Sequence, residues 1–208
     1  MDTSALTLRF RIGSIPVAIE PWFWLTGILL GGNYVGPRIV LWLGVFFVSI
    51  LVHELGHALA AQAFGAGARI RLYSFGGLTY PARPLSRWRN VAMTLAGPGA
   101  GFALGIAAFL FLRVSPFLTD TAHFTLQQLI WVNFGWGMMN LLPVPPLDGG
   151  HVLLGTLGRA HERTARIIGA VVAGLVAAWG LSTGSMYLGL MFGLLCWQNV
   201  QTVRAMQG

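Results

Sequence analysis

Six apolar runs dominate this sequence and limit what it can fold into. A helix needs about 20 apolar residues to cross the hydrocarbon core of a bilayer, and the first and fifth runs are short of that length. Charged residues make up 9% of the chain and hydrophobic residues 55%, which leaves too few charges to cover a water-soluble sphere. The sequence therefore predicts an integral membrane protein. The runs lie at about residues 21–32, 39–64, 91–112, 124–142, 167–181 and 185–200.

Two shorter segments carry a different pattern. Residues 68–80 alternate at period two and are interrupted by Gly76 and Gly77, which predicts a strand or hairpin. Residues 8–19 alternate more loosely, and we interpret them as a short strand or an interfacial segment. We expect an all-α membrane protein of about six transmembrane helices with this short β-strand or hairpin element near its active site. Because no loop is long enough for a second folded domain, we expect residues 1–208 to form a single domain without a PDZ-like insertion.

The arginines indicate a topology. The net charge is +7, and the basic residues lie between the apolar runs rather than in one basic patch, so we predict no nucleic-acid partner. With the N-terminus in the cytoplasm and six spans, only Arg38 and Arg113 fall outside, which agrees with the positive-inside rule. We therefore predict a multi-pass protein of a prokaryotic cell membrane, with both termini and the opening of the site toward the cytoplasm. The arginines on the inside are Arg9, Arg11, Arg69, Arg71, Arg83, Arg87, Arg89, Arg159, Arg163, Arg166 and Arg204.

His53, Glu54 and His57 form an H-E-x-x-H motif within the second apolar run. On a helix, residues four apart differ by about 40° around the axis, so both imidazoles can reach one metal ion while Glu54 handles a water proton. In a chain of this composition, a chance match is expected on the order of a few times in a thousand. The alternative is a purely structural pair of histidines. The motif predicts zinc-dependent hydrolysis inside a membrane.

A catalytic zinc usually has three protein ligands and an open position, so the two histidines need a third partner. Asp148 is the best candidate, since Glu54 and Asp148 are the two acids at membrane depth, where an unpaired carboxylate costs about 2.5 to 3.5 kcal/mol. The segment 140–150 contains three prolines and two glycines and cannot continue as regular helix. We expect it to line a watery cleft, although a solvated Asp148 in a surface turn is the alternative. The remaining acids, in ends or loops, are Asp2, Glu20, Asp120 and Glu162.

These motifs together resemble the site-2 protease family of intramembrane zinc metalloproteases. H-E-L-G-H at 53–57 matches the family's zinc-binding span, and 140–150 matches its N-x-x-P-x-P-x-x-D-G segment two spans later. The resemblance implies that His53, His57 and Asp148 bind one Zn²⁺ per chain and that Glu54 is the catalytic base. The chain departs from the family pattern at Gly101, where many members have Asn.

The resemblance also suggests roles for two further features. The amide of Asn140 could stabilise the oxyanion of the reaction, or it could make an ordinary interhelical hydrogen bond. A strand at 70–80 could capture an extended substrate by strand addition, or Gly76 and Gly77 could simply form a tight turn. His151 could donate a hydrogen bond near the metal, but packing or capping is the simpler interpretation, and we expect His123 and His161 in solvated loops.

The leading hypothesis is an intramembrane zinc endopeptidase that cleaves the transmembrane segments of single-span membrane proteins in the lipid bilayer. By resemblance, its substrates are membrane-held transcriptional regulators or signal-peptide remnants, and a separate adaptor or an upstream protease could be involved. The alternative is a membrane metal transporter that uses the same His/His/Asp cluster. Carriers usually have several polar residues along a path through the membrane, and these spans are nearly free of charge elsewhere. A catalytically silent scaffold is disfavoured because the ligands and the base are all present.

Overall fold

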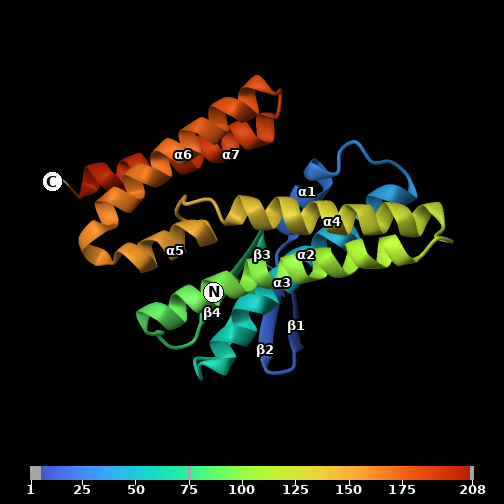
Figure 1. Cartoon of the computed structure of the whole chain (residues 1–208), viewed down its shortest axis with the longest axis horizontal. Helices are drawn as coiled ribbons and strands as arrows, with labels where there is room; N and C mark the ends of the chain where they lie inside the picture. The colour runs from blue at the N-terminus through green and yellow to red at the C-terminus, as the bar shows by residue number, and fades with distance from the viewer. Residues whose placement is uncertain (1–5, 75, 207–208) are drawn as a thin grey trace. The chain divides into compact units, whose positions relative to one another are not determined.

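The computed structural model describes residues 6–74 and 76–206, so Asp2 and residue 75 of the predicted hairpin lie outside the described residues. The chain divides into two compact units, residues 1–137 and 138–208 (Figure 1). As predicted, the protein is mostly helical with a small sheet. The expectation of one domain over the whole chain stays a prediction. The first unit contains β1 (Leu8–Ile12), β2 (Ile15–Ile19), α1 (Pro21–Leu30), α2 (Pro37–Ala63), β3 (Ala68–Tyr73), β4 (Gly76–Pro81), α3 (Arg87–Val114) and most of α4 (Asp120–Asn140).

The four strands form one sheet in the order β1-β2-β3-β4. Two antiparallel hairpins, β1/β2 and β3/β4, are joined by parallel pairing of β2 with β3, in which Val17 lies opposite Ile70. Alternate residues of β2 and β3 are buried, as the period-two pattern requires. The predicted hairpin at 68–80 is confirmed, and the segment 8–19 is a hairpin rather than an interfacial segment. Because the sheet ends at β4, this strand is an edge strand.

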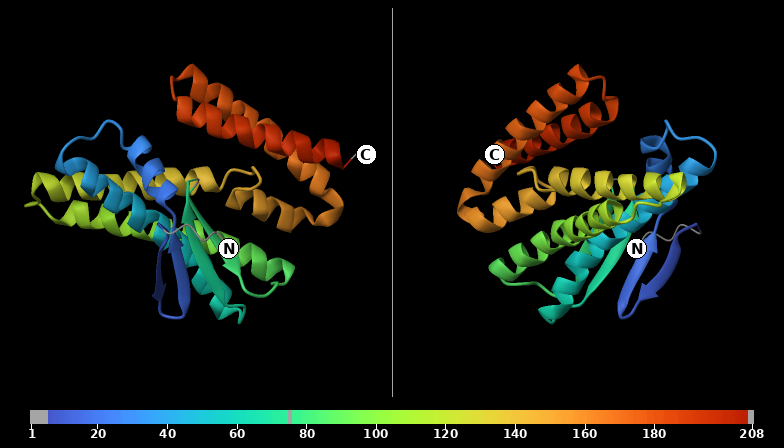
Figure 2. Two further views of the ribbon diagram at one scale, coloured as in Figure 1. Left: turned by 180° about the vertical axis from the view of Figure 1, so that it is seen from behind. Right: turned by 45° about the vertical axis from the view of Figure 1, so that its right-hand side comes forward.

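Helices α2, α3 and α4 run side by side in the first unit (Figure 2). Helices α2 and α3 are antiparallel, because His53 lies near Gly101 whereas His57, further along α2, lies near Gly97, earlier in α3. They approach closely at Gly56, where an added Cβ would lie 2.3 Å from the carbonyl oxygen of Ala96. Such an approach between helices requires a glycine. The middle of α2 is therefore held firmly against α3.

A cluster of buried apolar residues joins the sheet to α1 and α2. The rings of Phe23 in α1 and Phe46 in α2 stack with centroids 4.9 Å apart. The indole nitrogen of Trp42 donates a hydrogen bond of 2.8 Å to the carbonyl of Gly27. The short helix α1 is thus fixed along the first half of α2.

The second unit begins with the last residues of α4. It continues through an irregular segment, 141–147, to α5 (Asp148–Leu157), a 3-10 turn (Arg159–His161), α6 (Glu162–Ser182) and α7 (Met186–Ala205). Helices α6 and α7 pack together around Phe192, which is completely buried. The predicted loss of regular helix is confirmed for 141–147. It is wrong for Asp148, Gly149 and Gly150, which form the first turn of α5, because all three prolines lie before this turn and do not interrupt it.

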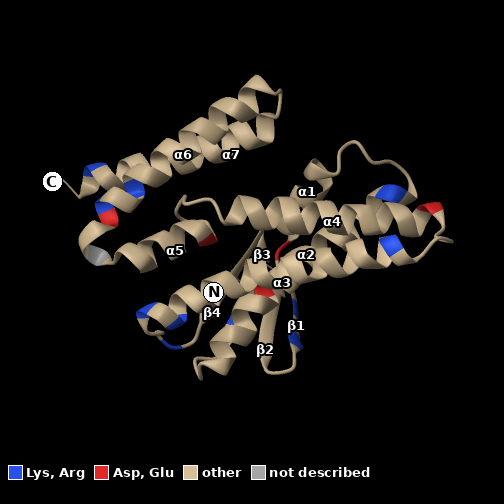
Figure 3. Cartoon of the chain, viewed as in Figure 1, with Lys and Arg blue, Asp and Glu red and all other residues tan. Residues whose placement is uncertain are grey.

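Three of the described helices are long and apolar enough to cross a membrane, namely α2, α3 and α6. These helices and the family described below support a membrane protein, while the count of about six spans is not confirmed. Apart from Glu54 within α2, the charged residues of the helices in the first unit lie near helix ends, with long uncharged stretches between them (Figure 3). Arg38 stands in the first turn of α2 and Arg113 in the last turn of α3, so the antiparallel pair brings both to one end. Arg87 and Arg89 lie at the opposite end of α3.

Candidate active site

The two histidines of the motif lie on one face of α2, as their spacing predicts. Both are buried, with 4% of His53 and 6% of His57 exposed. Their Nε2 atoms face each other at 3.2 Å. Two neutral imidazole nitrogens that converge in this way are suited to bind one metal ion, and zinc is a metal that such nitrogens prefer.

The second ring nitrogen of His57 has a partner that fixes the orientation of the ring. Its Nδ1 lies 2.9 Å from the main-chain carbonyl oxygen of Met93 in α3. A carbonyl can only accept a hydrogen bond, so Nδ1 carries the proton and Nε2 keeps its lone pair free for a metal. Helix α3 thus selects the form of His57 that can be a ligand.

Gly97 makes room for the His57 ring on the same side of α3. A Cβ at this position would lie 2.2 Å from Nε2 of His57, whereas a Cβ at Gly99 would meet nothing within 4 Å. The small-residue segment 96–101 therefore serves the metal site directly, in addition to helix packing.

Strand β4 lies on the carboxylate of Glu54, which is itself buried. The hydroxyl of Thr79 donates to Oε2 of Glu54 at 2.7 Å, and its Oγ1 is 3.1 Å from the main-chain carbonyl of the same residue. Two residues earlier, a Cβ at Gly77 would lie 2.3 Å from Cγ of Glu54. Gly77 and Thr79 point to one face of the strand, so β4 both covers Glu54 and hydrogen-bonds to it. Thr79 was not recognised from the sequence, because only the fold brings it to Glu54.

Burial raises the pKa of one tyrosine of the sheet. The pKa of Tyr73, the last residue of β3, is raised above its ordinary value, chiefly because burial disfavours the phenolate and also because Tyr80 and Glu54 add negative charge nearby. Tyr73 is therefore neutral at physiological pH. Tyr73 therefore adds no charge of its own near Glu54.

A small cavity adjoins His53 on the side of α4. It is lined by Ser49, His53, Gly101 and Asn133 together with four other residues. Asn133 is 3% exposed and donates to Ser49 Oγ at 2.9 Å and to the Leu129 carbonyl at 2.8 Å. Its Oδ1 lies 3.4 Å from where a Cβ of residue 101 would stand. The side-chain amide of Asn133 therefore lies beside Gly101. This amide comes from α4 rather than from position 101 itself, and it was not predicted from the sequence.

Asp148 and Asn140 belong to the second unit. Asp148 is half-buried and is the first residue of α5, where the helix dipole favours a negative charge. Asn140 is half-buried at the end of α4. His151 is exposed, and its Nδ1 lies 3.2 Å from the carbonyl of Leu147, one turn earlier.

The last two histidines lie at helix ends. His161 is exposed in the 3-10 turn. His123 is also exposed, but it lies in the first turn of α4 rather than in a loop as predicted. The apolar pattern that marked this helix starts only at residue 124, so the polar first turn was not recognised.

Comparison with known proteins assigns these features to a family. The family model for peptidase family M50 matches residues 41–119 and 115–180. Rip3 of Mycobacterium tuberculosis, named as a zinc metalloprotease, is 33% identical over 181 residues, which is 79% of this chain and 45% of that protein. A zinc metalloprotease of Methanocaldococcus jannaschii is 28% identical over 190 residues, which is 86% of this chain and 55% of that protein. The chain spans about half the length of the curated relatives it matches.

A solved structure, a site-2 protease from Methanocaldococcus jannaschii, has the same fold. The two structures superpose with a TM-score of 0.67 over 94% of each chain, at 23% identity. A buried histidine pair with an adjacent carboxylate on an apolar helix is the kind of site found in zinc hydrolases. The chain belongs to peptidase family M50, the zinc metalloproteases of the site-2 protease type. The metal-transport alternative is not favoured, because the family is one of peptidases.

Proposed function

We propose that this chain is an intramembrane zinc endopeptidase that cleaves transmembrane segments of single-span membrane proteins. The observation that carries the proposal is the pair of Nε2 atoms facing each other at 3.2 Å beside the buried carboxylate of Glu54. A site for a structural metal would be closed by four protein ligands. A pair of histidines with an adjacent acid leaves room for water and a base, which hydrolysis requires.

Asp148 is the proposed third ligand. His53, His57 and Asp148 each offer one ligand atom, and two histidines with one carboxylate are a donor set known from catalytic zinc sites. The zinc motif and the segment that carries Asp148 both lie within the part of the chain matched by the family model. Bound zinc would supply Lewis-acid activation of water and of the peptide carbonyl. The rest of the mechanism depends on the residues of the chain itself.

Glu54 is the proposed general base. Its carboxylate takes a proton from the attacking water and returns it to the leaving amine. Thr79 keeps Glu54 in place through the hydrogen bond to Oε2. Asn140, at the end of α4, is proposed to donate its amide hydrogen bond to the oxygen of the carbonyl under attack, where negative charge develops.

The edge strand β4 is the proposed substrate-binding element. A transmembrane helix hides its carbonyls in hydrogen bonds, so it must unwind before water can attack, and an extended segment can add to a sheet edge. Because β4 already covers Glu54, a segment paired with its free edge would lie beside the base. The proposed substrates are membrane-held regulators and signal-peptide remnants, which an adaptor or an earlier protease could deliver.

The proposed topology places the N-terminus in the cytoplasm. Arg38 and Arg113 then lie on the outer side, and Arg87 and Arg89 on the inner side, in agreement with the positive-inside rule. Helix α2 ends at Ala63, so the histidines lie roughly 9 to 15 Å along it from its cytoplasmic end at 1.5 Å per residue. Water would reach this depth from the cytoplasmic side.

Cleavage of a panel of tagged single-span proteins tests the proposal. The purified chain and its Glu54→Ala variant are compared at equal zinc content. Cuts within the transmembrane segment by the wild type, absent with the variant, are expected. If the variant cuts equally well, Glu54 is not the base; if vesicles loaded with either protein transport zinc and neither protein cuts, the protease proposal is wrong.

A further inference from the structure

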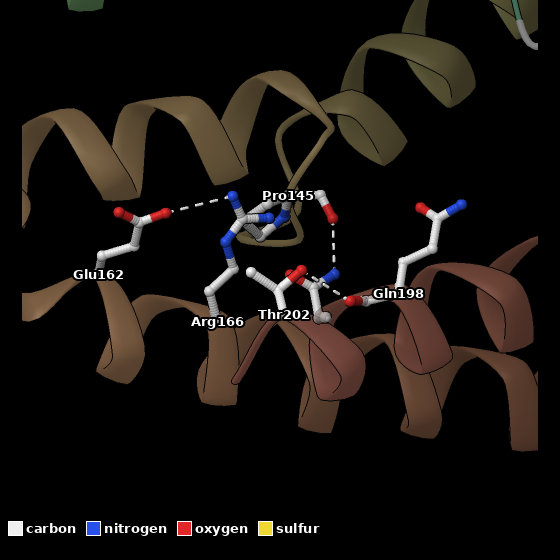
Figure 4. A network of polar contacts seen from close by, with 6 residues as sticks. Pro145, Glu162, Arg166, Gln198 and Thr202 are labelled. Carbon is white, nitrogen blue, oxygen red and sulfur yellow. Dashed lines mark hydrogen bonds and ion pairs between the residues drawn. The ribbon is translucent and has the colours of Figure 1, made fainter. Parts of the chain in front are cut away.

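Asn199 in α7 is a buried polar residue, only 1% exposed, far in sequence from the zinc motif. Its Nδ2 donates to the carbonyl oxygen of Pro145 at 2.6 Å and to that of Leu195 at 2.8 Å. The second contact is made within its own helix. The first joins α7 to a residue 54 positions earlier, in the irregular segment that precedes Asp148 (Figure 4).

The segment 141–147 needs such a partner. A buried carbonyl outside regular structure must find a hydrogen-bond donor or lose about 1 to 3 kcal/mol. Proline has no N–H, so neither Pro145 nor Pro146 can donate to a neighbouring carbonyl. Pro145 is buried, and the amide of Asn199 supplies the donor to its carbonyl from the side of α7.

Helix α6 holds the same proline from another side. A Cβ at Gly169 would lie 2.7 Å from Cδ of Pro145, so the backbone of α6 lies directly against the proline ring. Figure 4 shows Pro145 close to the helices that carry Arg166 of α6 and Thr202 of α7. The proline is therefore fixed by both helices of the α6–α7 pair.

Close packing links the position of Pro145 to that of Asp148. The amide of Leu147 donates to the carbonyl of Val144 at 2.8 Å, which closes a tight turn around Pro145. At the start of α5, a Cβ at Gly150 would lie 2.2 Å from the nitrogen of Pro145. The turn and the first turn of α5 pack on each other without space between them, so a shift of Pro145 must move Asp148.

We propose that Asn199 is a positioning residue for the third zinc ligand: its hydrogen bond to Pro145 holds the segment that aims the carboxylate of Asp148. This inference rests on the proposed role of Asp148. It assigns a function in zinc binding to α7, which contains no ligand. It also explains why the amide of Asn199 is buried.

Zinc release from the 208-residue chain in detergent tests the inference without any measurement of proteolysis. The zinc-loaded protein is mixed with excess chelator, and the zinc that remains bound is measured over time. Asn199→Leu removes both hydrogen bonds at similar size, and Asn199→Asp removes both donors at the same shape. We expect both variants to release zinc about 10 to 100 times faster than the wild type, the usual effect of losing a partner that orients a ligand.

Thr202→Val is the matched control. Thr202 lies three residues further along α7, and within the described part of the chain its hydroxyl donates a hydrogen bond to the Gln198 carbonyl of the same helix. This variant should release zinc at the wild-type rate. Helicity and the thermal midpoint of the metal-free proteins report whether each variant folds. If Asn199→Leu does not fold, Asn199→Asp decides the result.

Two variants separate failure of this inference from failure of the proposed ligand set. Asp148→Ala must itself release zinc rapidly; wild-type retention there would reject Asp148 as a ligand and Asn199 as its positioning residue. If Asp148→Ala loses zinc but both Asn199 variants retain it, only the inference is wrong. In the double variant Asp148→Ala/Asn199→Leu, release no faster than in Asp148→Ala is expected, and a further tenfold increase would mean that Asn199 acts on the fold rather than through Asp148.

Discussion

The two halves of the candidate site are constructed differently. His53, Glu54 and His57 sit in the middle of a 27-residue helix, and their neighbours on α3 and β4 contact them directly. Asp148 follows a segment without regular structure, and the contacts that fix this segment come from α6 and α7. The first half is thus fixed by helical spacing together with direct contacts from α3 and β4, whereas the second has no regular helix before it and depends on contacts from α6 and α7.

Because of this difference, the two halves of the site should respond differently to substitutions. Helical spacing alone determines that His53 and His57 face the same way, so changes near them should act at once on the metal or on the base. Asp148 has no such local guide. We expect the second half of the site to be more sensitive to changes far from the metal, and the following predictions test that contrast.

The largest effect is expected for Glu54→Gln. The amide keeps the size of the side chain beside Gly77 and can still accept the hydrogen bond from Thr79, but it cannot take a proton. General acid–base catalysis contributes about 10²- to 10⁴-fold, so cleavage should fall by that factor with zinc content unchanged. Substrate-cleavage rates at measured zinc occupancy check this. Loss of zinc from Glu54→Gln would mean that Glu54 supports the metal rather than the reaction.

Asp148→Ala should have the next largest effect, and it should act on zinc itself. Removing a ligand should exceed the loss of about 10- to 100-fold that follows removal of an orienting partner. Zinc affinity, measured by competition with a chelator of known strength, should fall at least as far as it does for His57→Ala. A much smaller loss for Asp148→Ala than for His57→Ala would assign the metal to the histidine half alone.

Gly97→Ala sharpens the comparison within the first half. The new methyl group would lie 2.2 Å from Nε2 of His57, so the ring must move away from its ligand position. We expect zinc affinity to fall about 10- to 100-fold. Gly99→Ala is the control on the same helix, because its methyl group would meet nothing within 4 Å. Equal zinc affinity for the two variants would contradict a fixed His57 ring.

Most of the helical framework could be predicted from the sequence. The six apolar runs correspond to α1, α2, α3, α4, α6 and α7, because a long apolar segment in lipid satisfies its backbone hydrogen bonds by forming a helix. The run at 39–64, for example, matches α2 to within two residues at each end. Helix α5 was missed because its sequence, rich in glycine, follows three prolines and carries no helical signal. The hairpin at 68–80 was predictable from its alternation, but its parallel pairing with residues 17–19 was not.

The same distinction applies to the site. His53, Glu54 and His57 were predictable because their relation is local to one helix turn. Gly97, Thr79, Asn133 and Asn199 were not assigned roles in the site, because each meets its partner only after distant segments pack together. Gly97 offered a partial signal in the small-residue segment 96–101. The buried asparagines of α4 and α7 offered another, since an amide in an apolar helix is costly without a hydrogen bond.

The smallest effect is expected for Thr79→Val. Valine keeps the shape of threonine and a β-branched residue in β4, but it removes the hydrogen bond of 2.7 Å to Oε2 of Glu54. A hydrogen bond worth about 1.4 kcal/mol corresponds to a factor of roughly ten in rate, so kcat should fall about tenfold. KM should stay the same if substrate pairs with the free edge of β4, because the side chain of residue 79 faces Glu54 instead. Thr79→Ser retains the hydroxyl and should restore the wild-type kcat. A rise in KM without a fall in kcat would place Thr79 in substrate binding rather than in the positioning of the Glu54 carboxylate.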